Sequence, residues 1–127
     1  MRVSAFRNMS GIGYPNAYAT PEQIANAPSK DKKLAMYVFN CAQRAHYNFL
    51  ENYTQALAAI LIGGLEYPIT SATLGAVWSV CRILYAVGYT RSGNKNASGR
   101  YAGAGAWLAQ FALFGVAGKI GYHLLMA

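Results

Sequence analysis

Residues 39–53 read FNCAQRAHYNFLENY, and they place charged and amide side chains at the start of a strongly apolar run. Arg44, Asn48 and Glu51 have the spacing i, i+4 and i+7, which predicts that they share one face of an α-helix. Directly after them, residues 56–65 contain no charged residue. The polar face therefore enters a predicted membrane-spanning helix, where ionisable groups are costly and are kept mainly for function.

The composition of the chain favours a membrane protein. Hydrophobic residues make up 54% of the 127 residues and charged residues only 12%, which lies outside the usual range of soluble domains. The mean hydropathy is only +0.16 because a polar N-terminal third and one basic loop lower the average. We expect residues 1–33 to form an irregular cytosolic segment, with a helix start at Thr20-Pro21-Glu22.

Three apolar runs are long enough to cross a membrane, which requires about 20 residues. They cover approximately residues 34–65, 69–89 and 101–126. The first two runs are joined by so few residues that their helices must be antiparallel neighbours, and Pro68 suits the first turn of the second helix. Residues 91–100 are rich in turn formers and basic residues, which predicts a solvated loop. The sequence therefore predicts an all-α fold, with residues 34–127 forming a bundle of antiparallel transmembrane helices.

Basic residues are distributed unevenly around these runs. Of the eleven Lys and Arg residues, five precede the first run and three lie in the second loop, and a helical hairpin brings both regions to one side. The eight are Arg2, Arg7, Lys30, Lys32, Lys33, Arg91, Lys95 and Arg100. The opposite side receives Glu66, Lys119 and the C-terminus, so the positive-inside rule predicts that the basic side faces the cytosol. Because the basic residues flank apolar runs, we expect membrane lipid and no nucleic acid as a partner.

The polar face of the first run matches a zwitterionic, peptide-like ligand. Arg44 is permanently charged and can bind a carboxylate at two points, while Asn48 can both donate and accept hydrogen bonds. Glu51 can accept from an ammonium or an amide. The alternative is that Arg44 and Glu51 only neutralise each other so that the helix can enter the membrane. The spacing alone leaves both interpretations open.

The second run carries a matching face, because Arg82, Tyr85 and Tyr89 have the spacing i, i+3 and i+7. Tyrosines near Tyr89 also suit the aromatic belt at a membrane interface. Arg82 lies about two turns, roughly 10 Å, from the cytosolic end, so we expect its partner to be Glu51 or a ligand. The two histidines of the chain lack ligand-spaced companions, so the sequence predicts no metal site.

Two motifs in this order resemble the MAPEG family, membrane-associated proteins of eicosanoid and glutathione metabolism. The motifs are FNCxQRAHxNxxExY over residues 39–53 and GxxWxxxRxLYxxGY over residues 75–89. The chain is most similar to the type-three microsomal glutathione transferases. Leukotriene C synthases have a tyrosine directly after the glutamate, whereas here Asn52 takes that place and Tyr53 follows, as in the type-three branch.

The resemblance implies a subunit of four membrane helices, assembled as a homotrimer with glutathione bound between neighbouring subunits near the cytosolic face. The three runs seen here would be the last three, and the first helix is expected just upstream of Arg2. The residues that match glutathione ligands are Arg44, Asn48, Glu51, Tyr53, Arg82, Tyr85 and Tyr89, together with Arg7. The arginine that activates the glutathione thiol would be Arg100, with Arg91 as the alternative.

The activity implied by the resemblance is that of a glutathione transferase, with glutathione peroxidase or leukotriene C synthase activity as variants. Glutathione would be the co-substrate, and a lipophilic electrophile or lipid hydroperoxide the second substrate. The expected location is the endoplasmic reticulum or the outer mitochondrial membrane. Two alternatives are a non-catalytic lipid-binding scaffold of the same family and an inactive truncated product.

Overall fold

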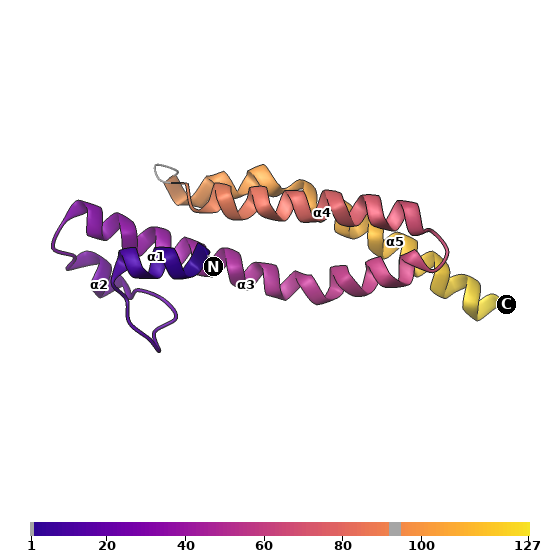
Figure 1. Ribbon diagram of the computed structural model, residues 1–127, viewed down its shortest axis with the longest axis horizontal. Helices are drawn as coiled ribbons and strands as arrows, with labels where there is room; N and C mark the ends of the chain where they lie inside the picture. Colours follow the sequence, from indigo (N-terminus) through magenta and orange to yellow (C-terminus); the bar gives the residue numbers. More distant parts are fainter. Residues whose placement is uncertain (1, 92–94) are drawn as a thin grey trace.

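The computed structural model describes residues 2–91 and 95–127, with only the backbone for residues 95 and 96. Every regular element in this part of the chain is a helix, which confirms the predicted all-α class (Figure 1). The elements are α1 (Arg2–Ser10), α2 (Pro21–Ala25), α3 (Lys30–Gly64), α4 (Pro68–Tyr89), the 3₁₀ helix η1 (Lys95–Gly103) and α5 (Gly105–Met126).

Helix α3 is the longest element and organises the others. Its 35 residues extend about 52 Å at a rise of 1.5 Å per residue. It starts at Lys30, earlier than the predicted run, because the Ser29 side chain caps it by accepting a hydrogen bond from the backbone N–H of Lys32 at 3.1 Å. The first half of α3 packs against α1 and α2, and its second half packs against α4 and α5 (Figure 1).

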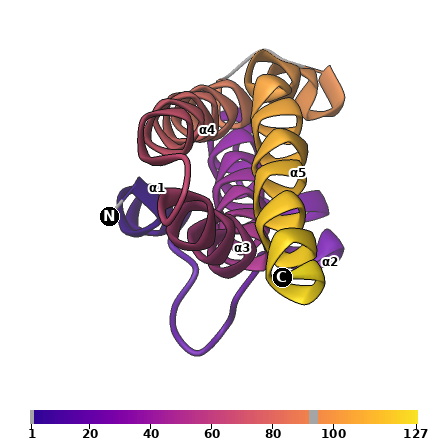
Figure 2. The same cartoon turned by 90° about the vertical axis from the view of Figure 1, so that its right-hand side faces the viewer.

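Helices α3, α4 and α5 contact one another in all three pairs, and the end-on view shows them as three neighbouring columns (Figure 2). Successive helices run in opposite directions, as predicted (Figure 1). Pro68 occupies the first turn of α4, as expected from its fixed φ and missing N–H. Of the helices in residues 2–91 and 95–127, α4 and α5 are long and apolar enough to cross a membrane. The span at residues 34–65 stays a prediction, because polar residues occupy the first half of α3.

The two ends of the bundle differ in charge. At one end, His123 Nδ1 lies 3.6 Å from Glu66 Oε2, and Lys119 Nζ lies 4.9 Å from the centre of the Tyr67 ring. At the other end lie the start of α3, the last turn of α4 and η1 (Figure 1), and this end includes Lys30, Lys32 and Lys33 of α3, Arg91 directly after α4, and Lys95 and Arg100 of η1. This is the charge asymmetry on which the predicted orientation depends.

Two local predictions are wrong. Residues 1–33 are not irregular throughout, because they contain α1 and α2. The predicted start at Thr20 is confirmed, since Thr20 and Gln23 cap each other reciprocally at the beginning of α2. Residues 91–100 are not simply a solvated loop, because η1 forms there and packs along α4.

Two glycines allow η1 to approach the backbone of α4 closely. A Cβ on Gly88 would meet the backbone carbonyl of Gly99, and a Cβ on Gly103 would meet the Cys81 carbonyl oxygen and the Tyr85 side chain. Only residues without a side chain fit at such contacts. This packing sets where the residues of η1 lie relative to the last turns of α4.

We predict that Gly103→Ala lowers the free energy of unfolding by roughly 1–3 kcal/mol, because the added methyl forces η1 away from α4. The matched control is Gly115→Ala in α5, where nothing lies within 4 Å of the added Cβ. That variant should unfold at an unchanged or higher temperature, because alanine is the better helix former by about 1 kcal/mol. Thermal unfolding in detergent, followed by circular dichroism, compares the two. Equal destabilisation would contradict the packing described above.

Candidate functional site

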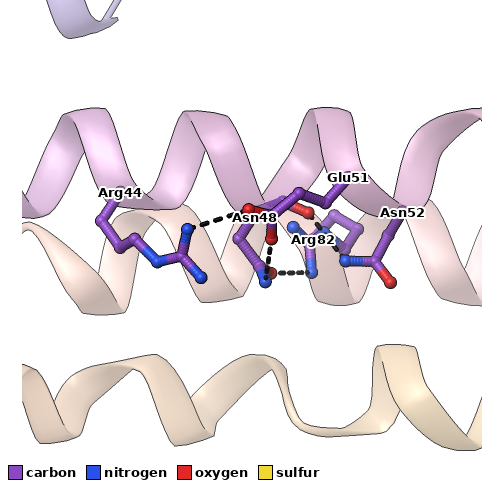
Figure 3. Close-up of polar contacts among 5 residues, drawn as sticks. All are labelled: Arg44, Asn48, Glu51, Asn52 and Arg82. Atoms are coloured by element: carbon purple, nitrogen blue, oxygen red, sulfur yellow. Dashed lines mark hydrogen bonds and ion pairs between the residues drawn. The ribbon is translucent and has the colours of Figure 1, made fainter. Parts of the chain in front are cut away.

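The predicted polar face of α3 is present in the structure. Arg44 Nη1 donates a hydrogen bond to Glu51 Oε1 at 2.9 Å, and Asn48 Nδ2 approaches Glu51 Oε2 at 3.4 Å (Figure 3). The side chains of Arg44 and Glu51 are 50% and 51% exposed. An ion pair that is half exposed contributes little to stability, about 0–1 kcal/mol, so it can exchange its partners for a ligand at small cost.

Arg82 reaches this face from α4. Its Nη1 donates a hydrogen bond to Asn48 Oδ1 at 2.9 Å, so Asn48 links Arg82 to Glu51 (Figure 3). Of the two expected partners of Arg82, Glu51 does not bond it directly, because Asn48 lies between them, and a ligand stays a prediction. The guanidinium lies 4.8 Å from the Tyr85 ring centre, and only 6% of the residue is exposed. Its Nε and Nη2 are buried and have no hydrogen-bond partner in the part of the chain that the structure describes.

A buried chain of hydrogen bonds starts at the backbone of Asn48, on the polar face of α3, and runs into the bundle. It was not predicted from the sequence. Asn52 Nδ2 donates to the backbone carbonyl of Asn48 at 2.8 Å, and Asn52 Oδ1 accepts from Gln110 Nε2 at 3.3 Å. Gln110 Oε1 accepts from Trp78 Nε1 at 3.0 Å. These bonds join α3, α5 and α4, and both ends of each amide are satisfied. The sequence did contain one sign of these bonds, because Gln110 is a polar amide within the otherwise apolar run of residues 101–126, where it needs a buried partner.

Residues from four segments of the chain line one open cavity of about 420 Å³ at the basic end of the bundle. We call it the η1 cavity. It is lined by Tyr18, Tyr37, Asn40, Cys41, Arg44, Tyr89, Ala97 and Arg100. Three predicted site residues, Arg44, Tyr89 and Arg100, therefore meet around one hollow. Two guanidiniums in one cavity provide a site for an anionic ligand.

Of the two candidate activating arginines, Arg100 is the one at this cavity. Its guanidinium lies 5.8 Å from the centre of the Tyr89 ring and donates to the hydroxyl of Tyr101 at 3.3 Å. Hydrogen bonds to Tyr101 and Tyr89 raise the pKa of Arg100 above its usual value, so it stays charged wherever a thiol titrates. Arg91 is exposed just after α4 and does not line the η1 cavity.

Tyr18 belongs to the cavity because two amides hold its segment on α3. Asn40 exchanges two hydrogen bonds of 2.8 Å with the backbone of Ala19, and Gln43 Nε2 donates to the carbonyl of Ala17 at 2.7 Å. Burial, followed by the neighbouring Tyr47, raises the pKa of Tyr18, so its hydroxyl remains a neutral donor at pH 7. Tyr18 was missed because its position depends on contacts between segments about 20 residues apart.

Of the predicted glutathione ligands, Arg44 and Tyr89 line the η1 cavity. Asn48, Glu51 and Arg82 do not line it and make the contacts described above, and the other three lie elsewhere. Arg7 is buried beneath the loop that follows α1, where Nη1 donates to the Asn16 carbonyl at 2.7 Å and the guanidinium covers the Phe39 ring at 4.7 Å. Tyr53 packs on Phe49, with ring centres 5.3 Å apart, on another face of α3. Tyr85 lies behind the cavity, in edge contact with Tyr89 at 5.4 Å.

Among the described residues, no group of three or more His, Cys, Asp and Glu side chains is placed to hold a metal ion. The polar groups that line the η1 cavity are the guanidiniums of Arg44 and Arg100, the Asn40 amide, the tyrosine hydroxyls and the Cys41 thiol. Such groups can bind an anion through several hydrogen bonds and stabilise negative charge on it. The site has the composition expected for an anionic, peptide-like ligand.

Comparison with known proteins agrees with the helical architecture and the two sequence motifs. No solved structure matches the chain. The model of the MAPEG family matches residues 1–119, which is nearly the whole sequence. The chain therefore belongs to the MAPEG family, whose members are membrane helix bundles and include glutathione transferases.

Proposed function

We propose that this protein is a glutathione transferase of the type-three microsomal class, with glutathione peroxidase activity on lipid hydroperoxides. The observation that carries the proposal is the meeting of Arg44, Tyr89 and Arg100 around the η1 cavity. These residues come from three different elements, α3, α4 and η1. A family member that only presents lipid has no need of such a peptide-binding face.

Arg44, which lines the η1 cavity, and its neighbours Asn48 and Glu51 on the same face of α3 suit the ends of glutathione. Arg44 can exchange its half-exposed pairing with Glu51 for a glutathione carboxylate, and the released Glu51 can then accept from the ligand ammonium. The hydrogen bond from Arg82 holds the Asn48 side chain in place. The Asn48 Nδ2 therefore stays close to Glu51, where it can contact the peptide groups of glutathione. The buried bonds of Asn52 to the Asn48 carbonyl and to Gln110 support this turn of α3.

Arg100 has the properties required to activate the thiol. A free thiol has a pKa of about 8.5, and a neighbouring guanidinium lowers it by stabilising the thiolate. In the transferase reaction the glutathione S–H loses its proton to solvent, the thiolate forms a bond to an electrophilic carbon, and the leaving group departs with its electron pair. The protein contributes positioning and positive charge and supplies no nucleophile of its own.

In the peroxidase reaction the same thiolate attacks the O–O bond of a lipid hydroperoxide. The first step releases the lipid alcohol and leaves glutathione sulfenic acid. A second glutathione then attacks the sulfenic sulfur, so that two glutathiones and one hydroperoxide become glutathione disulfide, alcohol and water. Leukotriene C synthesis is a less favoured variant, because Asn52 replaces a tyrosine and its side chain is committed to the buried chain of hydrogen bonds.

The proposal includes a homotrimer in the endoplasmic reticulum or outer mitochondrial membrane, with the η1 cavity facing the cytosol. The basic end of the bundle, where the cavity lies, supports this orientation under the positive-inside rule. In the trimer, Arg7 and Tyr53 would have to reach glutathione from a neighbouring subunit or act only through packing. A non-catalytic lipid-binding scaffold and an inactive truncated product are the alternatives that the experiments below separate.

Arg44→Ala should weaken glutathione binding roughly tenfold or more, because the charge-assisted hydrogen bond from Arg44 to a glutathione carboxylate is lost. Isothermal titration calorimetry of purified protein measures the dissociation constant. Lys30→Ala, which removes an exposed cation from the same helix, is the matched control and should bind normally. Wild-type protein that is folded but binds no glutathione would favour the scaffold alternative.

Arg100→Ser should lower kcat for conjugation of a small chlorinated aromatic by about 10²–10³-fold while glutathione still binds. The rate should also rise at higher pH than in the wild type, because the bound thiol returns toward its free pKa of about 8.5 once the guanidinium is absent. Arg91→Ser is the control and should retain wild-type turnover. If Arg91→Ser is the inactive variant, or if both variants are fully active, the assignment of Arg100 is wrong.

Gln110→Leu should destabilise the protein by about 1–2 kcal/mol and raise the KM for glutathione, because Asn52 and Trp78 both lose their partner. Asn52→Leu should have a similar effect. In the double variant the two losses should be less than additive, since each substitution breaks the same bond. Unfolding in detergent and steady-state kinetics are the measurements, and strict additivity would argue against a connected chain.

A further inference from the structure

Three tyrosine hydroxyls line the η1 cavity, and two of them are hydrogen-bonded to neighbouring groups of the protein. Tyr37 bonds the buried thiol of Cys41. Tyr89 bonds the guanidinium of Arg100. The third tyrosine, Tyr18, has no hydrogen-bond partner in the part of the chain that the structure describes. The Tyr18 hydroxyl is therefore free to bond a substrate in this cavity.

The contacts of Tyr18 hold its ring in place but leave it accessible to water. The backbone of the residues on either side is bonded to Asn40 and Gln43 of α3. The ring stacks on Tyr47, with ring centres 6.1 Å apart and planes inclined by 25°. A side chain held in this way meets the geometric requirement for a reacting group. Because Tyr18 is 38% exposed, its hydroxyl can also exchange protons with water.

The charged and titratable groups that face Tyr18 are Arg44, Glu51 and Tyr47 of α3 and Tyr89 of α4. Burial, followed by Tyr47, raises the pKa of Tyr18, whereas the positive charge of Arg44 acts in the opposite direction. The hydroxyl therefore keeps its proton at pH 7. The same guanidinium can stabilise the tyrosinate that forms when the proton is transferred to a substrate.

Reduction of a lipid hydroperoxide needs a proton donor that conjugation of an aryl chloride does not need. When the O–O bond breaks, the lipid oxygen leaves as an alkoxide, a base comparable to hydroxide, whose conjugate acid water has a pKa of about 16. Chloride leaves without a proton. The guanidiniums of Arg44 and Arg100 cannot supply the proton, because arginine does not deprotonate in proteins. A tyrosine hydroxyl, with a usual pKa of about 10, can transfer its proton to an alkoxide.

We propose that Tyr18 is the proton donor to the leaving oxygen in the peroxidase reaction, an assignment that rests on the proposed function. The glutathione thiolate forms a bond to the terminal oxygen of the hydroperoxide, and the electron pair of the O–O bond moves to the lipid oxygen. This oxygen takes the phenolic proton of Tyr18. Sulfur is thereby oxidised to the sulfenic acid, the hydroperoxide is reduced to the alcohol, and the tyrosinate regains a proton from water.

Tyr18→Phe tests the assignment, because it removes only the hydroxyl and keeps the stacked ring. Its kcat/KM for linoleic acid hydroperoxide should fall by about 10²-fold or more, the usual contribution of a general acid. Conjugation of a chlorinated aromatic should change far less. Tyr47→Phe removes the hydroxyl of the stacking partner and is the matched control, which should keep the wild-type ratio of the two activities. An unchanged ratio in Tyr18→Phe would overturn the proposal.

A peroxy acid provides a second readout, because its leaving group is a carboxylate, whose conjugate acid has a pKa of about 4 and which needs no proton. Tyr18→Phe should therefore reduce perlauric acid nearly as fast as the wild type, and an equal loss with both peroxides would overturn the proposal. Wild-type protein that conjugates glutathione but reduces no hydroperoxide would overturn the assignment of Tyr18 and leave the transferase function intact. Wild-type protein that binds no glutathione in calorimetry would overturn both.

Discussion

The hydrogen bond between Arg82 and Asn48 is the interaction on which the arrangement of this protein depends. A guanidinium buried among apolar helices must find acceptors inside the protein, because lipid offers none. Asn48 supplies one acceptor, and this bond aligns the polar face of α3 with the last three turns of α4. Glu51 and Arg44 then continue the same line of contacts toward the η1 cavity (Figure 3).

The same requirement explains the buried amides. Asn52 and Gln110 would each be costly alone in an apolar bundle, but together with Trp78 they satisfy one another. Hydrogen bonds are directional, so these bonds form only when α5 packs against α3 and α4 in one register. Support for the proposed site thus comes from residues that do not line the η1 cavity. The close glycine contacts of η1 with α4 act in a similar way, because they set the position of Arg100 beside Tyr89.

Two faces of α3 carry two kinds of chemistry. One face presents a half-exposed ion pair that is easily exchanged for a ligand, and the other presents aromatic and aliphatic side chains. Arg82 lies between them, with one nitrogen bonded to Asn48 and two buried nitrogens without a partner among the described residues.

The sequence by itself determined the helical class, the antiparallel order and the shared faces, because these depend on local periodicity and on short connections. It also predicted the family to which the chain belongs and left open whether Arg44 and Glu51 pair with each other or bind a ligand. Only the tertiary structure decided that Asn48 pairs with Arg82, that Arg100 and not Arg91 lies at the η1 cavity, and that Tyr18 joins them. It also placed Arg7 and Tyr53 elsewhere. These outcomes depend on the register between segments far apart in sequence, which side-chain packing and buried hydrogen bonds decide and local periodicity does not encode.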